Sequence, residues 1–215
     1  MIETRSEGKF ITLEGGEGAG KSTSREYIVD LLTAGGIPFV ETREPGGTAL
    51  GESLRSLLLT KDGTPPSVEA ELLMVFAARA QHLHEVIEPA LASGKWVLCD
   101  RFTDATYAYQ GYGRGFDLST IEVLERMVQK DRQPDLTLLF DLDPKVGIER
   151  ARNRAELDRF ESEELAFFER VREGYLARAG CSERFVVINA AQAITEVQAS
   201  IRTSLTAFIE GRKHG

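Results

Sequence analysis

The chain has 215 residues and a mass of 23.8 kDa, and 42% of its residues are hydrophobic while 28% are charged. This composition can form a buried core, so it excludes a disordered, collagenous or fibrous protein. The net charge of −8 argues against a nucleic-acid partner. No apolar stretch is long enough to cross a membrane, residues 1–7 lack the apolar region of a secretory signal, and the two cysteines cannot build a disulfide framework. We therefore expect a cytoplasmic protein with no membrane partner.

Short apolar runs alternate with longer amphipathic segments along the chain. Strands that are apolar throughout and separated by helices are typical of a parallel sheet covered on both faces. The sequence thus predicts one α/β domain over residues 1–215, with a five-stranded parallel sheet and helices on both faces. We expect Pro89 to interrupt the third helix. The strands are expected at 9–14, 38–42, 96–100, 136–141 and 185–188, and the first three helices at 21–34, 49–59 and 69–92.

The loop after the first strand carries a phosphate-binding pattern. Residues 15–22 read Gly-Gly-Glu-Gly-Ala-Gly-Lys-Ser and match G-x-x-x-x-G-K-[ST] at every fixed position. Glycines let successive backbone N–H groups turn towards an anion, and the helix start adds its positive dipole end. We expect Lys21 to reach the β- and γ-phosphates and the Ser22 hydroxyl to bind Mg²⁺. The pattern predicts a nucleoside triphosphate site formed by Gly15, Gly16, Glu17, Gly18, Ala19, Gly20, Lys21, Ser22 and Thr23.

Two further features favour a small kinase. Asp100 and Arg101 stand at the end of the third strand, the edge of a parallel sheet where ligands bind. There a carboxylate can organise the metal's water shell, and a guanidinium can bridge two phosphates. Arginines also cluster between 150 and 161, where they could form a short lid that closes over the triphosphate: Arg150, Arg152, Arg154 and Arg159.

Several motifs together resemble bacterial thymidylate kinase, and the resemblance covers nearly the whole chain. They are the phosphate loop at 13–23, Thr-Arg-Glu-Pro-Gly-Gly-Thr at 42–48, Phe-Ala-Ala-Arg at 76–79, Asp-Arg-Phe at 100–102 with Ala-Tyr-Gln-Gly at 108–111, and the lid-like 150–154 with Leu-Asp-Arg at 157–159. The resemblance implies the P-loop nucleoside monophosphate kinase fold with a short arginine-rich lid. It also implies transfer of the γ-phosphoryl group of Mg-ATP to dTMP by a homodimer.

The resemblance also implies roles for individual residues. Glu17 would face the 3′-hydroxyl of the deoxyribose, and Arg55 and Arg101 would hold the acceptor phosphate. Lys21 and Arg101 would be catalytic together with Glu17 and a lid arginine, for which Arg150, Arg152 and Arg154 all remain candidates. The metal would lie near Ser22, Asp100 and Glu161. The dTMP site would comprise Glu44, Pro45, Arg55, Phe76, Arg79, Arg101, Thr106, Tyr109, Gln110 and Asp158, with Arg79 on the thymine carbonyl.

One position departs from the family pattern. Many relatives carry a phenylalanine four positions before the arginine that contacts the base, whereas this chain has Val75 there and Phe76 three positions before Arg79. Either side chain could lie near the base, because both spacings fall close to one helix face. His82 and His84 are expected on the surface. Other readings of the whole chain are a kinase for a different nucleoside monophosphate, or a nucleotide-dependent switch or partitioning ATPase.

Overall fold

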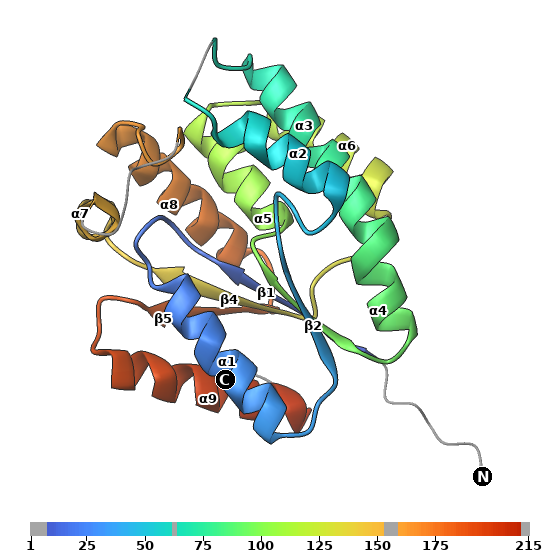
Figure 1. Ribbon diagram of the computed structural model, residues 1–215. Coiled ribbons are helices and arrows are strands. Elements are labelled where there is room, and N and C mark those ends of the chain that lie inside the picture. Colours follow the sequence, from blue (N-terminus) through green and yellow to red (C-terminus); the bar gives the residue numbers. More distant parts are fainter. Residues whose placement is uncertain (1–7, 62–63, 153–158, 212–215) are drawn as a thin grey trace.

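A computed structural model describes residues 8–61, 64–152 and 159–211. Five strands, all parallel, form one sheet in the order β2-β3-β1-β4-β5 (Figure 1). The predicted α/β fold with a five-stranded parallel sheet is therefore confirmed. The strands are β1 (Phe10–Glu14), β2 (Phe39–Arg43), β3 (Trp96–Asp100), β4 (Leu136–Asp141) and β5 (Phe185–Asn189).

Helices connect consecutive strands, as the alternating sequence pattern predicts. In the part of the chain that is described, none of them is long and apolar enough to cross a membrane. They are α1 (Lys21–Ala34), α2 (Ala49–Leu59), α3 (Val68–His82), α4 (Glu88–Ala92), α5 (Thr103–Thr106), α6 (Leu118–Gln129), α7 (Pro144–Arg152), α8 (Leu165–Gly180) and α9 (Ile194–Ile209), with π-helical turns at η1 (Leu83–Ile87) and η2 (Tyr107–Gly113).

The two faces of the sheet bury different sets of helices, because successive side chains of a strand point to opposite faces. Ile11 of β1 lies beside Leu98 and Leu136 of the flanking strands, and this row packs under Ile28 of α1 and Ile201 of α9. Figure 1 shows α1 and α9 together on that face. On the opposite face Phe10 and its neighbours pack against η1 and α4, while η2 and α8 cover the β4 side.

The carboxyl ends of the strands meet at one edge of the sheet and bring three loops together there. Asp100 at the end of β3 lies beside Leu13 of β1 and Arg43 of β2. Its carbonyl accepts the N–H of Glu44 at 2.9 Å, and the N–H of Arg101 donates to the carbonyl of Leu13 at 2.9 Å. Arg101 has a φ of 68°, a left-handed conformation that is uncommon for a side chain of this size. These backbone bonds fix the direction in which Arg101 leaves the sheet.

The long helical segment expected at 69–92 is interrupted, but not at Pro89. Helix α3 ends at His82, and a π-helical turn separates it from α4, with the Glu88 N–H donating to the carbonyl of Leu83. Pro89 lies in the first turn of α4, where a helix needs no N–H donor. The expectation is therefore corrected: the break lies at residues 83–87.

Candidate active site

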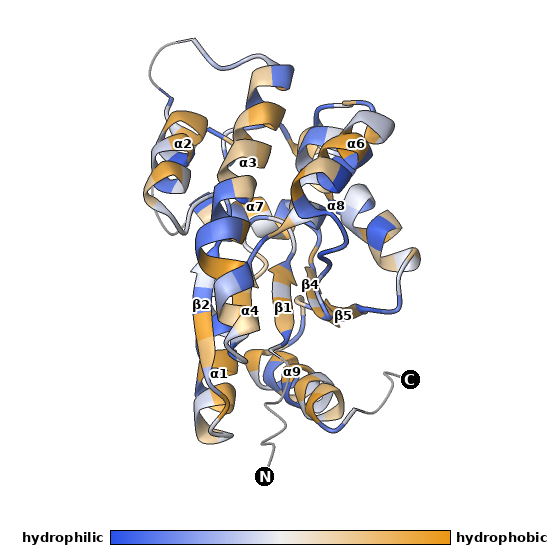
Figure 2. Cartoon of the chain, turned by 90° about the vertical axis from the view of Figure 1, so that its right-hand side faces the viewer, coloured by the Kyte–Doolittle hydropathy of each residue, from blue (hydrophilic) through white to orange (hydrophobic). Residues whose placement is uncertain are grey.

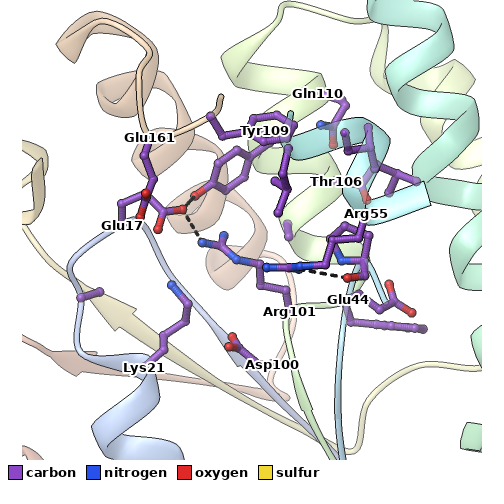
Figure 3. A pocket seen from close by; sticks show the side chains of 18 of the residues that line it. Glu17, Lys21, Glu44, Arg55, Asp100, Arg101, Thr106, Tyr109, Gln110 and Glu161 are labelled. Carbon is purple, nitrogen blue, oxygen red and sulfur yellow. Dashed lines mark hydrogen bonds and ion pairs between the residues drawn. The ribbon is translucent and has the colours of Figure 1, made fainter. Parts of the chain in front are cut away.

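A cavity of about 280 Å³ opens at the carboxyl edge of the sheet (Figure 3). It extends from the phosphate loop at Glu17–Ser22 to Thr106 and Gln110, with Arg101 between the two ends. Most of the residues predicted for the two substrates and the metal line it together. These are Glu17, Gly18, Ala19, Gly20, Lys21, Ser22, Glu44, Pro45, Arg55, Arg79, Asp100, Arg101, Thr106, Tyr109, Gln110 and Glu161.

The phosphate loop has the glycine-dependent shape that its sequence predicts. Gly18 has a φ of 67°, and a Cβ atom there would lie 2.1 Å from the carbonyl oxygen of Gly147. The Lys21 Nζ atom donates to the carbonyls of Gly15 and Gly16 at 2.8 and 2.9 Å. Burial and the nearby charge of Arg101 lower the pKa of Lys21 to about 8. An anionic phosphate placed here would favour the protonated lysine and would compete for its N–H groups.

Glu17, Arg101 and Tyr109 form a compact polar group in the middle of the cavity (Figure 3). The guanidinium of Arg101 and the Tyr109 hydroxyl both donate to the same Glu17 oxygen, the hydroxyl at 2.7 Å. Arg101 also lies over the Tyr109 ring, 4.9 Å from its centroid. Burial opposes ionisation of Glu17, but the charges of Arg101 and Lys21 outweigh it and lower the pKa of Glu17 to about 2. Glu17 is therefore an anion that holds Arg101 in place.

A second carboxyl group, Glu14, lies beneath this layer and is missing from the sequence prediction. It is completely buried and accepts the Phe102 N–H at 2.7 Å and the Tyr175 hydroxyl at 3.0 Å. Tyr175 in turn accepts from Arg101 at 3.3 Å. Burial, with the charge of Asp104, raises the pKa of Glu14 to about 8. An acidic residue at the end of an otherwise apolar strand is the only sequence signal for this group.

Asp100 and Ser22, two of the residues predicted near the metal, both line the cavity. Asp100 Oδ1 is buried and has no hydrogen-bond partner in the described part of the chain, and Ser22 lies in the first turn of α1. Within the described residues no three His, Cys, Asp or Glu side chains form a metal cluster. Mg²⁺ commonly keeps several waters and uses one or two protein oxygens together with substrate phosphates, so this sparse set fits Mg²⁺.

The far end of the cavity is built on a buried ionic group. Glu44 accepts from Arg79 Nε at 2.7 Å and lies 2.9 Å from Nδ1 of His82. His82 Nε2 lies 2.6 Å from the Thr42 hydroxyl. The expectation of a surface position is confirmed for His84 and wrong for His82, which is fully buried. The spacing of three residues from Arg79, which puts both on one helix face, is a signal that could have found it.

One nitrogen atom of the Arg79 guanidinium, Nη1, remains available to donate a hydrogen bond to a ligand. Its Nη2 atom donates to the Thr106 hydroxyl at 2.9 Å, whereas its buried Nη1 atom has no partner among the described residues. Val75, one turn earlier on α3, lines the cavity. Phe76 instead packs in the core against Leu72, and the Arg79 guanidinium lies 4.9 Å from its ring centroid. Of the two side chains that could lie near the base, Val75 lines the cavity and Phe76 does not, because the helix phase turns Phe76 into the core.

The lid residues are only partly described. Arg154 and Asp158 lie outside the described residues. Arg150 donates to the carbonyl of Ala190 at 3.2 Å and Arg152 is exposed, and neither lines the cavity. After the gap, Glu161 lines the cavity, and Arg159 donates to the Leu58 carbonyl at 2.7 Å.

A phosphate loop at the carboxyl edge of a parallel sheet, joined in one cavity to a second pocket with its own cations, defines a P-loop kinase that acts on a small acceptor. The family model for thymidylate kinase matches residues 13–201. Over 203 residues the chain is 58% identical to the thymidylate kinase of Teredinibacter turnerae, with 94% of this chain and 99% of the relative covered. It is 57% identical to that of Pseudomonas savastanoi pv. phaseolicola over 207 residues, covering 96% and 99%. The chain belongs to the thymidylate kinase family.

Proposed function

We propose that this protein transfers the γ-phosphoryl group of Mg-ATP to dTMP, giving dTDP for dTTP synthesis. The observation that carries the proposal is that one continuous cavity extends from the phosphate loop past Arg101 to Arg79 and Gln110. A donor phosphate at one end and a nucleotide base at the other would bring the two phosphates together at Arg101. Family membership and the single sheet support one kinase domain over the chain.

Positioning and charge neutralisation supply the chemistry. The nucleophile is an anionic phosphate oxygen, so the site needs no strong general base. Lys21 and the backbone N–H groups of residues 15–22 hold the transferred group, and Arg101 bridges donor and acceptor phosphates, where negative charge develops. Arg55, which lines the cavity, joins Arg101 on the acceptor phosphate. Thr23 would add a second hydroxyl group to the ATP site, and one of the lid arginines, Arg150, Arg152 or Arg154, would contact the triphosphate.

Mg²⁺ is the proposed cofactor. The Ser22 hydroxyl and the unpartnered Oδ1 of Asp100 would hold the ion and its waters, with Glu161 at the opposite wall. When bound, the ion would neutralise charge on the β- and γ-phosphates. Asp158, which lies outside the described residues, would orient Arg101.

Different side chains would contact the deoxyribose and the base of dTMP. Glu17, held by Arg101 and Tyr109, would face the 3′-hydroxyl, and Tyr109 would lie against the sugar, where a 2′-hydroxyl is disfavoured. Arg79 uses its free Nη1 donor on a pyrimidine carbonyl. Glu44 fixes the direction of that donor, because it already holds Arg79 Nε from behind. Pro45, Thr106 and Gln110 line the remaining walls.

The acceptor series tests this function. ADP release from Mg-ATP is measured with dTMP, dUMP, dCMP, dAMP, dGMP or no acceptor. We expect high turnover with dTMP, lower turnover with dUMP and almost none otherwise. Preference for another monophosphate would support the sibling kinase, and steady hydrolysis without an acceptor would support a switch or partitioning ATPase.

Arg101→Ala tests the bridging role. We expect a loss of about 10²–10³ in kcat, the size found when one donor to a developing oxyanion is removed. Arg202→Ala is the matched control, because Arg202 on α9 bonds only the Tyr27 hydroxyl among its described hydrogen bonds. An unchanged kcat with a raised ATP KM would contradict the bridging role.

A homodimer in the cytoplasm completes the proposal. Helices α2, α3 and α6 lie side by side, and each contains hydrophobic residues, coloured orange in Figure 2. We assign this face to a second copy of the chain, since its largest side chains are more than half exposed: Leu57, Leu73, Val123 and Met127. The free thiols of Cys99 and Cys181 suit a reducing compartment.

Sedimentation tests the dimer. We expect the mass of two chains for the natural protein and of one chain for Val123→Glu. Leu176→Glu is the control, because Leu176 is an exposed apolar residue on α8, away from this face. A single-chain mass for the natural protein at micromolar concentration would refute the dimer.

A further inference from the structure

Glu71 lies behind the base end of the cavity and has no role in the function described so far. It precedes Val75 and Arg79 by one and two helical turns on α3, so the three share one face of the helix. Val75 and Arg79 line the cavity, whereas Glu71 is 1% exposed and lies one layer further in. A carboxylate is seldom buried to this degree unless it is paired, so its partners indicate its purpose.

The two oxygens of Glu71 have different partners. Oε1 accepts from Gln110 Nε2 at 2.9 Å, and Oε2 accepts from Arg159 Nη2 at 2.7 Å. Arg114 adds longer contacts of 3.4 and 3.5 Å. A carboxylate paired with arginines is an acceptor and offers no donor. The side-chain amide of Gln110 must therefore turn its NH₂ group towards Glu71.

This contact determines what Gln110 presents to a ligand. Gln110 lines the cavity, and its amide oxygen is the group that remains when the NH₂ group is held from behind. Arg79, which lines the same cavity, has a buried Nη1 donor without a partner among the described residues. The lining of the base end thus offers a base both a donor and an acceptor. Thymine and uracil carry a carbonyl next to a ring N–H and fit that order, whereas cytosine carries an amino group next to an unprotonated nitrogen and reverses it.

We propose that Glu71 is a positioning residue that sets base specificity by fixing the amide orientation of Gln110. The proposal rests on the function above, because it takes the acceptor base to lie at this end of the cavity. Without the carboxylate, the Gln110 amide could turn over and offer a donor to cytosine. The binding of cytosine then costs less free energy, because the Gln110 amide no longer leaves a buried polar group unpaired against it.

The contact with Arg159 affects all acceptors alike. Arg159 also donates to the Leu58 carbonyl at 2.7 Å and lies 4.3 Å from the centroid of the Phe160 ring, which packs edge-on against Tyr109. Loss of this contact would change the binding of dTMP, dUMP and dCMP by similar factors. A ratio between acceptors therefore isolates the effect of amide orientation.

The experiment measures kcat/KM of Glu71→Gln for dTMP and dUMP at saturating Mg-ATP, and the inhibition constant of dCMP against dTMP. We expect the preference for dTMP over dCMP to fall about tenfold or more, the effect of losing one discriminating hydrogen bond. The ratio of dTMP to dUMP should not change, because both bases present the same edge. The fall in kcat/KM for dTMP should come mainly from a higher KM and not from a lower kcat.

Glu163→Gln is the matched control. Glu163 pairs with the same Arg114, at 2.6 Å, and has no described contact with Gln110, so its variant should keep the natural preference. If Glu71→Gln does not fold, Glu71→Asp keeps the charge for the arginines and shortens the reach to Gln110, with the same expected loss. An unchanged preference in a folded Glu71 variant overturns this inference alone. A natural protein that does not phosphorylate dTMP overturns the proposed function and this inference with it.

Discussion

Replacing Glu44 by glutamine tests whether the base end of the cavity is held together by its buried charges. Glu44 and Arg79 are 4% and 1% exposed, and their contact is 2.7 Å long. Removing one partner of a buried pair costs about 3–5 kcal/mol, because the other charge stays buried without compensation. Glutamine keeps an oxygen for Arg79 Nε and can turn its NH₂ group towards His82 Nδ1, but it carries no charge to compensate the buried guanidinium. We expect a loss of about 3 kcal/mol in the free energy of unfolding.

Urea unfolding measures this loss directly, and acceptor kinetics measure its consequence. A domain with ordinary stability of about 5–15 kcal/mol remains folded after such a loss. The Arg79 guanidinium would lose its support on one side, so we expect the KM for dTMP to rise about tenfold while the KM for ATP stays unchanged.

Glu52→Gln is the matched control on the same side of the site. Glu52 pairs with Arg43 at 2.8 Å, but both side chains are almost half exposed, and such pairs contribute about 0–1 kcal/mol. Equal losses in the two variants, or a Glu44→Gln protein within about 1 kcal/mol of the natural one, would refute the reasoning.

Two further predictions concern protons. The pKa of Lys21 is about 8 in the free protein, and a bound phosphate should raise it. ADP binding at pH 9 should therefore take up a proton, and the affinity for ADP should fall as the pH rises above about 8. Calorimetry in buffers of different ionisation enthalpy measures this proton uptake, and Lys21→Arg should abolish the uptake. Glu14 has its pKa raised from 4.5 to about 8, so stability is lost as the pH rises between these values. Glu14→Gln should remove this loss, which at about 1.4 kcal/mol per pKa unit is at most about 5 kcal/mol; identical urea midpoint shifts from pH 5 to pH 8 in both proteins would contradict the prediction.

Local sequence patterns were sufficient to predict the parts of the site that lie within one loop or one strand end. The phosphate loop depends on glycines and a helix start that are adjacent in the chain, and Arg101 follows directly from its strand. The parallel sheet followed from strands that are apolar throughout. These features depend on short-range geometry, which a single sequence contains.

The supporting residues could not be predicted because their partners are distant in the chain. Glu14 bonds to Tyr175, 161 positions later, and Glu71 bonds to Gln110, 39 positions later. The choice between Val75 and Phe76 depends on the rotation of α3 about its axis, and no local pattern fixes that rotation. His82 differs in part: its contacts with Glu44 and Thr42 span 38 and 40 positions, but its spacing of three residues from Arg79 was a local signal of burial.

The two ends of the cavity differ in how much must change when substrates bind. At the base end, Arg79 already has its Glu44 and Thr106 contacts and keeps a free Nη1 donor, so a base can bind without breaking a bond. At the phosphate end, Lys21 donates to two loop carbonyls and must exchange neutral acceptors for phosphate oxygens. That exchange becomes more favourable as charge develops on the transferred group. Changes at the base end should therefore appear mainly in the KM for the acceptor, and changes at Lys21 mainly in kcat.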